Sequence, residues 1–184
     1  MAYYALASKM NTPEKIYRYE NEQEYQVLKA LAQPVPKSCD LSAIIGQMFV
    51  LMRRAQGIGL AAPQVGISQR FFIIEIEKNR PLVFINPEII STGADLNIHE
   101  EGCLSLPKLY AKVQRPASVR IQARDASYRL FTLEAEDILA TCIQHELDHL
   151  NGVLFIDRLN AAAREQALRR YKKIVAKEQK KAGR

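Results

Sequence analysis

Residues 144–152 read QHELDHLNG, and the remainder of the chain is best interpreted around them. This stretch contains two histidines, His145 and His149, four residues apart. Residues with this spacing lie one above the other on the same face of an α-helix, so both imidazoles can reach one metal ion. Glu146, beside the first histidine, can then act on a water bound to that metal. We therefore expect a metal-binding helix whose third ligand lies elsewhere in the chain.

The residues around this stretch predict that the helix is buried. It begins near Asp137 and ends at residues 151–152, an Asn-Gly pair. One side of the helix carries Ile138, Cys142, His145 and His149. Much of the remaining circumference is covered by Leu139, Ile143, Leu147 and Leu150. A helix that is apolar nearly all round is typical of a core. Two histidines and two carboxylates in such a helix are costly unless a metal organises them, which argues against ordinary hydrogen-bonded core histidines.

The third ligand has several candidates. No histidine lies three residues after Gly152, so the long zinc-protease pattern does not apply. Glu165 is available as a downstream glutamate but lies in a basic stretch, and Cys142 lies one turn too early and fits better as a pocket wall. Cys103, in HEEGCLSLP at residues 99–107, is favoured over a merely buried thiol because the glycine and proline indicate a turn or strand end that presents it. A Cys-His-His set leaves a fourth position for water, as a catalytic metal requires.

The composition indicates one globular domain. The 184 residues are 48% hydrophobic and 25% charged. No apolar run approaches the roughly 18 to 20 residues of a membrane span, and the first ten residues lack the pattern of a secretion signal, so we expect a cytoplasmic protein that binds no membrane. The three cysteines are an odd number, which favours free thiols or metal ligands over disulfides.

The hydrophobic pattern predicts an α+β fold. A helix is expected from a cap at Asp40 to a stop at Gly57. Strands are expected at residues 70–77, at 82–85 before Asn86-Pro87, and as a hairpin at 118–124 and 129–134. We expect these strands to form antiparallel sheets packed around the central buried metal-binding helix, with a further helix at the C-terminus.

The charge is concentrated at the C-terminal end. Residues 161–184 contain nine Lys or Arg against two Glu, a net charge of +7, whereas the whole chain carries +6. We therefore divide the chain into an N-terminal extension at 1–33, a catalytic metal-hydrolase domain at 34–160, and a basic C-terminal helix or tail at 161–184.

Three segments together point to a family. GIGLAAPQ at residues 57–64, EGCLS at 101–105 and QHELDH at 144–149 occur in the order and spacing found in peptide deformylases, and the chain closely resembles that family from about Asp40 to Asp157. The resemblance implies removal of the formyl group from the N-terminal formyl-methionine of newly made polypeptides. It also implies one divalent ion, ferrous iron with zinc, nickel or cobalt tolerated. By position, the ligands are Cys103, His145 and His149.

The resemblance also assigns the surrounding residues. A water bound to a dication loses a proton near neutral pH, and Glu146 is expected to take that proton and deliver it to the leaving amine as general acid/base. The Gln64 side-chain amide and the Leu104 backbone N–H are expected to stabilise the oxyanion. Gly59 should bond to the extended peptide. The expected walls of the methionine pocket are Ile58, Ile138 and Cys142, with His99 where the family often has an apolar residue.

Other positions are expected to act outside the chemistry. Glu101 and Arg115 match a salt-bridged scaffold pair of the family, and Tyr110 stands where some relatives have an arginine at the rim of the cleft. The C-terminal helix can dock at the ribosomal exit region in the family, and the +7 charge suits ribosomal RNA phosphates, although a solvated helix also fits. We expect no DNA partner. The alternatives are an HExxH metallopeptidase and a ribosome-associated protein with a degenerate metal site.

Overall fold

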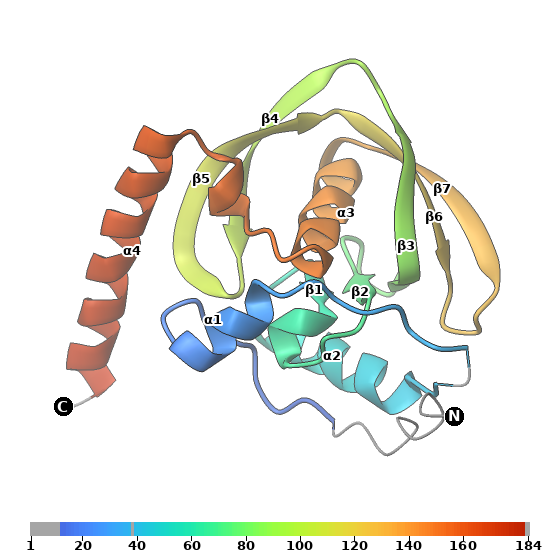
Figure 1. The fold of residues 1–184 in the computed structure, drawn as a ribbon, viewed down its shortest axis with the longest axis horizontal. Helices are drawn as coiled ribbons and strands as arrows, with labels where there is room; N and C mark the ends of the chain where they lie inside the picture. The colour runs from blue at the N-terminus through green and yellow to red at the C-terminus, as the bar shows by residue number, and fades with distance from the viewer. Residues whose placement is uncertain (1–11, 38, 183–184) are drawn as a thin grey trace.

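The computed structural model describes residues 12–37 and 39–182, so expectations about residues 1–11 lie outside it (Figure 1). The helices are α1 (Glu22–Leu28), α2 (Ser42–Arg54), α3 (Asp137–Leu150) and α4 (Ala161–Ala182), with short 3-10 helices η1 (Ala62–Val65) and η2 (Phe155–Arg158). The strands are β1 (Gly59–Ala61), β2 (Phe71–Ile74), β3 (Leu82–Thr92), β4 (Leu96–Cys103), β5 (Leu106–Pro116), β6 (Ser118–Arg124) and β7 (Leu130–Glu136).

The strands form two antiparallel sheets. One sheet has five strands in the order β1-β2-β3-β6-β7, and the other is the hairpin β4-β5. Helix α3 lies between them and contacts strands of both sheets, and α4 runs along the outside of β5 (Figure 1). The predicted α+β class, the antiparallel sheets and the C-terminal helix are confirmed.

Burial of α3 agrees with its apolar circumference. Ten of its fourteen residues are buried, including both histidines and the acidic residues Glu146 and Asp148. The helix begins at Asp137 and ends at Leu150, at the expected bounds. Among the described residues, no helix has both the length and the apolar character required to cross a membrane.

Strand β2 explains why helices cover both faces of the five-stranded sheet. All four of its residues are fully buried. Successive side chains of a strand point to opposite faces, so Phe72 and Ile74 belong to the core that contains Ile143 of α3, whereas Phe71 and Ile73 pack in the core formed with α2. A third core joins β5, η2 and α4.

Several expected boundaries are wrong. The strand expected at 70–77 is shorter, because β2 ends at Ile74. Helix α2 begins at Ser42, because the Asp40 side chain accepts the backbone N–H of Ser42 from outside the helix, and it ends at Arg54. Strand β3 does not stop at Asn86-Pro87 but continues to Thr92. A register shift follows Ile85, and Asn86 takes a left-handed conformation with φ of 50° while its side chain bonds both backbone polar groups of Val35. The bulge therefore accommodates the proline within a strand.

Two elements have no clear sequence pattern. Helix α1 is only seven residues long and depends on Asn21, whose side chain accepts the N–H of Glu24. In β4, the side chains on the more buried face are His99, Glu101 and Cys103, whereas Leu96 and Ile98 are exposed. The usual alternation of apolar-in and polar-out residues is thus inverted in this strand, and two of its inner residues, Glu101 and Cys103, line a cleft of the molecule.

Candidate active site

Three potential metal ligands converge where the second sheet meets α3. The ligand atoms of Cys103, His145 and His149 all lie within 4.8 Å of one another. The Cys103 Sγ is 3.2 Å from the His149 Nε2, and the two imidazole rings have centroids 5.1 Å apart. Cys103 stands at the end of β4, as expected, but its side chain is buried. A thiol and two imidazoles form a donor set that suits a transition-metal dication, so the residues present fit a metal-binding site.

A buried charge network orients the first histidine. The Nδ1 of His145 lies 2.8 Å from a carboxylate oxygen of Glu101, so its Nε2 is left to face the other ligands. Arg115 donates two hydrogen bonds to Glu101 and one, of 2.8 Å, to Asp148. Arg158 of η2 binds both carboxylate oxygens of Asp148. Burial alone would raise the pKa of Glu101, but its hydrogen bonds with His145 and Arg115 lower the pKa to about 2.

Gln64 presents its amino group to the same centre. Its side chain is 1% exposed, and its Oε1 accepts the backbone N–H of Ala61 at 2.9 Å. The Nε2 therefore points the other way, where it lies 3.2 Å from the Ser105 hydroxyl and 3.5 Å from the Cys103 Sγ. Leu104 lies between Cys103 and Ser105 in the sequence, in the turn that joins β4 to β5.

Glu146 is a buried carboxylate. Its Oε2 has no hydrogen-bond partner among the described residues. Burial raises the pKa of Glu146 to about 7. A methyl group added to Gly59 would lie 2.4 Å from the Oε1 of this carboxylate, so the backbone of β1 runs directly past it.

Several of the site residues line one cleft of about 510 Å³. The cleft contains Glu146, Gln64, Leu104, Cys103 and His145. The expected pocket residues Ile58, Gly59, Ile138 and Cys142 line it too. Ile58 and Ile138 are about two-fifths exposed, at 41% and 45%, which leaves apolar surface open to a bound side chain.

The other residues considered as ligands or pocket walls differ in whether they line the cleft. Cys142 lies in the wall of the cleft but outside the three-ligand group, and burial raises the pKa of its thiol well above the usual value. Glu165 is on α4, where it pairs with Arg169. His99 is not among the residues that line the cleft, whereas Tyr110 is exposed and does line it.

Sequence reasoning missed three groups of this site. Ser105 is fully buried and accepts a bond from Gln64, and Thr141 lines the cleft. Asp148 is held by two arginines. A signal existed only for Asp148, because a carboxylate in a buried helix requires cationic partners. Which arginines supply them depends on the tertiary structure.

The comparisons with known proteins agree with each other. A family model described as polypeptide deformylase matches residues 13–165. The chain is 45% identical over 154 residues to the peptide deformylase of Hydrogenovibrio crunogenus, covering 82% of this chain and 90% of that one. A crystal structure of a peptide deformylase from Legionella pneumophila has a TM-score of 0.83 and 37% identity, covering 91% and 98% of the two chains. A peptide deformylase from Synechococcus elongatus, solved in complex with actinonin, has a TM-score of 0.79 and 41% identity, covering 89% and 91%.

An α+β fold with a buried HExxH helix and a thiol beside its two histidines is typical of a metal-dependent hydrolase. Within that class, the matched family model and the relatives all point to one family, the polypeptide deformylases. The chain belongs to the polypeptide deformylase family, as its three sequence motifs had indicated.

Proposed function

We propose that this chain removes the formyl group from the formyl-methionine at the N-terminus of newly made polypeptides. The observation that supports this most directly is the convergence of the candidate ligand atoms of Cys103, His145 and His149 within 4.8 Å, beside a cleft that Glu146 and Gln64 line. Membership of the deformylase family supports the same reaction. The proposal includes a cytoplasmic location, because newly made chains are the substrate.

Cys103, His145 and His149 are the proposed ligands of one divalent ion. Ferrous iron is proposed as the native ion, and zinc, nickel and cobalt also suit a thiolate with two imidazoles. Such an ion supplies a Lewis acid, which brings the pKa of a coordinated water down to near neutrality. The Glu101 carboxylate keeps the His145 ring oriented for this role through its 2.8 Å contact with Nδ1.

The other residues are proposed to move the proton and to stabilise charge. Glu146 receives the proton released by the attacking water and delivers it to the leaving amine. The Gln64 amino group and the Leu104 backbone N–H donate to the oxygen on which negative charge develops. The contact of Gln64 Oε1 with the N–H of Ala61 supports this assignment, because it turns the amino group toward the cleft.

The peptide is proposed to bind along β1. This strand is at the edge of the five-stranded sheet, so Gly59 can offer backbone hydrogen bonds to an extended chain. Ile58, Ile138 and Cys142 are the proposed walls for the methionine side chain. Such pairing reads backbone rather than sequence, as an enzyme that processes many different polypeptides requires.

A formate-release assay tests this function. The protein is purified without oxygen, its metal is identified, and it is given an N-formyl-methionyl tripeptide and the N-acetyl equivalent. We expect release of formate from the first and little hydrolysis of the second. Cleavage of internal peptide bonds with no release of formate would favour a metallopeptidase instead. Glu146→Ala should retain the metal and lose at least about 10²-fold in kcat.

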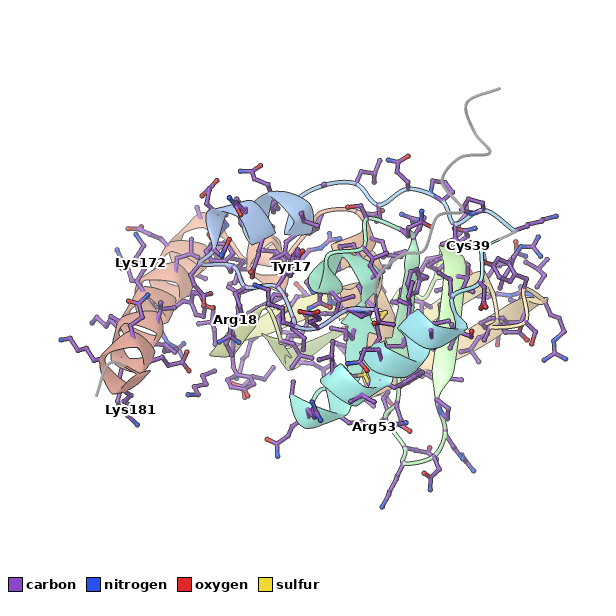
Figure 2. All side chains as sticks on the ribbon, turned by 90° about the horizontal axis from the view of Figure 1, so that it is seen from below. Tyr17, Arg18, Cys39, Arg53, Lys172 and Lys181 are labelled. Carbon is purple, nitrogen blue, oxygen red and sulfur yellow. The ribbon has the colours of Figure 1, made fainter. Side chains whose placement is uncertain are left out.

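We also propose that α4 binds the ribosome. Its exposed cations include a series whose spacing places them on one side of the helix: Arg169, Arg170, Lys173, Lys177, Lys180 and Lys181. The opposite side packs on the body through Ala167 and Tyr171. Figure 2 shows Lys172 and Lys181 projecting from α4, far from Arg53 of α2. A surface of this kind suits the phosphates of ribosomal RNA.

Charge reversal at two positions tests the ribosome contact. Lys173→Glu/Lys177→Glu should weaken ribosome binding and reduce the slope of log K against log salt by about 2, whereas deformylation of a tripeptide stays unchanged. The control is Lys78→Glu/Arg80→Glu, which changes the net charge equally in the turn between β2 and β3. Equal binding by both variants and the parent would refute a specific role for α4.

A further inference from the structure

The two proposed oxyanion donors come from different sheets. Gln64 is in η1, which directly follows β1 of the five-stranded sheet, and Leu104 is in the turn of the β4-β5 hairpin. An oxyanion site requires its donors at a fixed separation, and a displacement of about 1 Å can cost up to 10²-fold in rate. Some part of the structure must therefore hold η1 and the hairpin turn together.

Side-chain contacts alone are poorly suited to this task. Leu104 packs on the apolar cluster that includes Ala62 and Val65 of η1, but such packing has no fixed direction. The side-chain hydrogen bonds between η1 and the hairpin, among the described residues, are those of the Gln64 Nε2 with the Ser105 hydroxyl, at 3.2 Å, and with the Cys103 Sγ, at 3.5 Å. Both use the amino group that is proposed to turn to the substrate during the reaction. A connection through the backbone does not have this conflict.

Residues 15–19 supply such a connection. The backbone N–H of Tyr17 donates to the carbonyl of Gln64 at 2.7 Å, and that of Tyr19 donates to the carbonyl of Ser105 at 2.9 Å. Between them, the N–H of Arg18 points the other way and donates to the Glu24 carboxylate at 2.6 Å. This alternation is that of an extended chain, in which residues two apart face the same side and lie about 7 Å apart. None of residues 15–19 lines the catalytic cleft.

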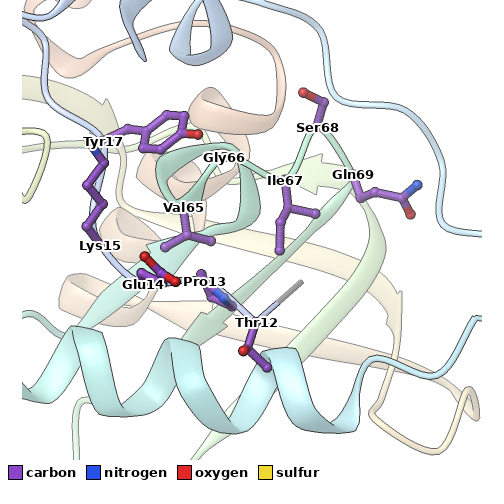
Figure 3. A pocket seen from close by; sticks show the side chains of 10 residues that line it. All are labelled: Thr12, Pro13, Glu14, Lys15, Tyr17, Val65, Gly66, Ile67, Ser68 and Gln69. Atoms are coloured by element: carbon purple, nitrogen blue, oxygen red, sulfur yellow. The ribbon is translucent and has the colours of Figure 1, made fainter. Parts of the chain in front are cut away.

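The segment 15–19 is itself anchored at both ends. The Glu24 carboxylate also accepts from the Lys15 Nζ, at 2.5 Å. The Tyr17 ring lies against Gly66, where φ is +82° and an added methyl group would come within 2.4 Å of the tyrosine hydroxyl. Figure 3 shows Lys15 and Tyr17 on one side of a cavity of about 490 Å³, which the loop at Val65 and Gly66 also lines.

The far end of the segment rests on α1 and α4. The Tyr19 ring makes edge contacts with Tyr25 of α1 and Tyr171 of α4, at centroid distances of 5.1 and 5.9 Å. The Tyr171 hydroxyl donates to Glu20 at 2.6 Å. The segment is therefore fixed by elements that do not take part in the chemistry.

We propose that residues 15–19 form a positioning brace, which sets the separation between Gln64 and Leu104 through the backbone N–H groups of Tyr17 and Tyr19. The proposal rests on the oxyanion role given to these two residues in the proposed function. The brace touches no reacting atom and acts only through the carbonyl groups of Gln64 and Ser105.

Deleting one hydrogen bond of the brace tests this role. Tyr17 is replaced by its α-hydroxy analogue, which exchanges the backbone N–H for an oxygen and keeps the side chain. We expect kcat to fall roughly tenfold, below the 10²- to 10³-fold cost of removing a donor outright, with KM and metal content unchanged. In the Gln64→Ala background the same exchange should change kcat less than about twofold, because coupled positions are not additive. In the metal-free protein, the side-chain amide resonance of Gln64 should also shift.

The control is the same exchange at Tyr128. Its N–H also makes a backbone bond, donating to the Asp125 carbonyl at 2.8 Å, in the turn between β6 and β7. It should leave kcat and the Gln64 resonance unchanged. Equal, additive losses in both backgrounds, or a fall in melting temperature with kcat unchanged, would overturn the brace. If Gln64→Ala alone keeps the parental kcat, the oxyanion assignment fails instead.

Discussion

Gly59 lies so close to the Glu146 carboxylate, the proposed general acid/base, that the absence of its side chain is part of the site. An added methyl group would be 2.4 Å from the Glu146 Oε1 and 2.9 Å from the Cys142 Sγ. One of these atoms must shift to make room, and both belong to buried side chains of α3 that line the cleft. The glycine is needed for space rather than for conformational freedom.

Gly59→Ala is therefore expected to displace Glu146 and to lower kcat for deformylation by about 10²-fold. Steady-state kinetics with a formyl-methionyl peptide measures this. Gly46→Ala is the matched control, because an added methyl group at this exposed position of α2 has no heavy atom within 4 Å. It should keep full activity and raise the free energy of unfolding by up to about 1 kcal/mol. Unchanged kcat in Gly59→Ala would show that the carboxylate tolerates the displacement.

At the scale of elements, η2 joins the parts that surround the site. Arg158 at its end holds Asp148 of α3, and Asp157 accepts from the N–H of Leu154. Asp157 also pairs with Lys29, at the C-terminal end of α1, and with Arg164 of α4. Burial alone would raise the pKa of Asp157, but the hydrogen bonds from Lys29 and Leu154 lower it below the usual value.

This lowered pKa sets the direction of a pH dependence. A carboxyl group whose folded-state pKa is depressed stabilises the fold at pH values above its unfolded pKa of about 3.9, and the gain is lost as the pH falls through the folded pKa. Asp157→Asn should lower the free energy of unfolding by about 1 kcal/mol at pH 7, and the difference should shrink below about pH 4. Urea unfolding between pH 3 and 7 measures it, with the exposed Asp95→Asn as control. A difference that stays constant across this range would contradict the ion-pair account.

At the scale of the whole molecule, the proposed metal ligands come from different parts of the fold. Cys103 comes from the two-stranded sheet, whereas His145 and His149 come from the helix that packs on both sheets. A ligand that binds the folded state alone stabilises it in proportion to its occupancy. The proposed ion should thus stabilise the complete fold and not only the cleft.

Chelation should consequently lower the free energy of unfolding. The expected difference is about 2.7 kcal/mol between metal-free protein and protein with free metal at one hundred times its dissociation constant. Cys103→Ala should lose most of this increment. The control is Cys39→Ala, which removes a partly buried thiol beside α2 and should keep the stabilisation by metal. Equal unfolding free energies with and without bound metal would contradict a site that bridges the two parts of the fold.

Much of the fold was predictable from local patterns. The apolar circumference of α3, the β6-β7 hairpin and the basic composition of α4 follow from periodicity and composition, and the structure has all three. The β4-β5 hairpin was not predictable, because the inner face of β4 carries His99, Glu101 and Cys103 in place of apolar residues. Helix α1 was not predictable because a seven-residue helix depends on tertiary contacts more than on its own sequence.

For the site, the motifs alone identify the residue types and their grouping: the two histidines and the glutamate on one helix, and the segments that contain Gln64 and Cys103. How Cys103 reaches the histidines, which arginines pair with Asp148, and how residues 15–19 reach the carbonyl groups of Gln64 and Ser105 depend on the packing of distant segments. The reason is that spacing along a helix determines the relative positions only of side chains about one turn apart. Contacts between segments far apart in sequence depend on how the sheets pack, which local patterns do not encode.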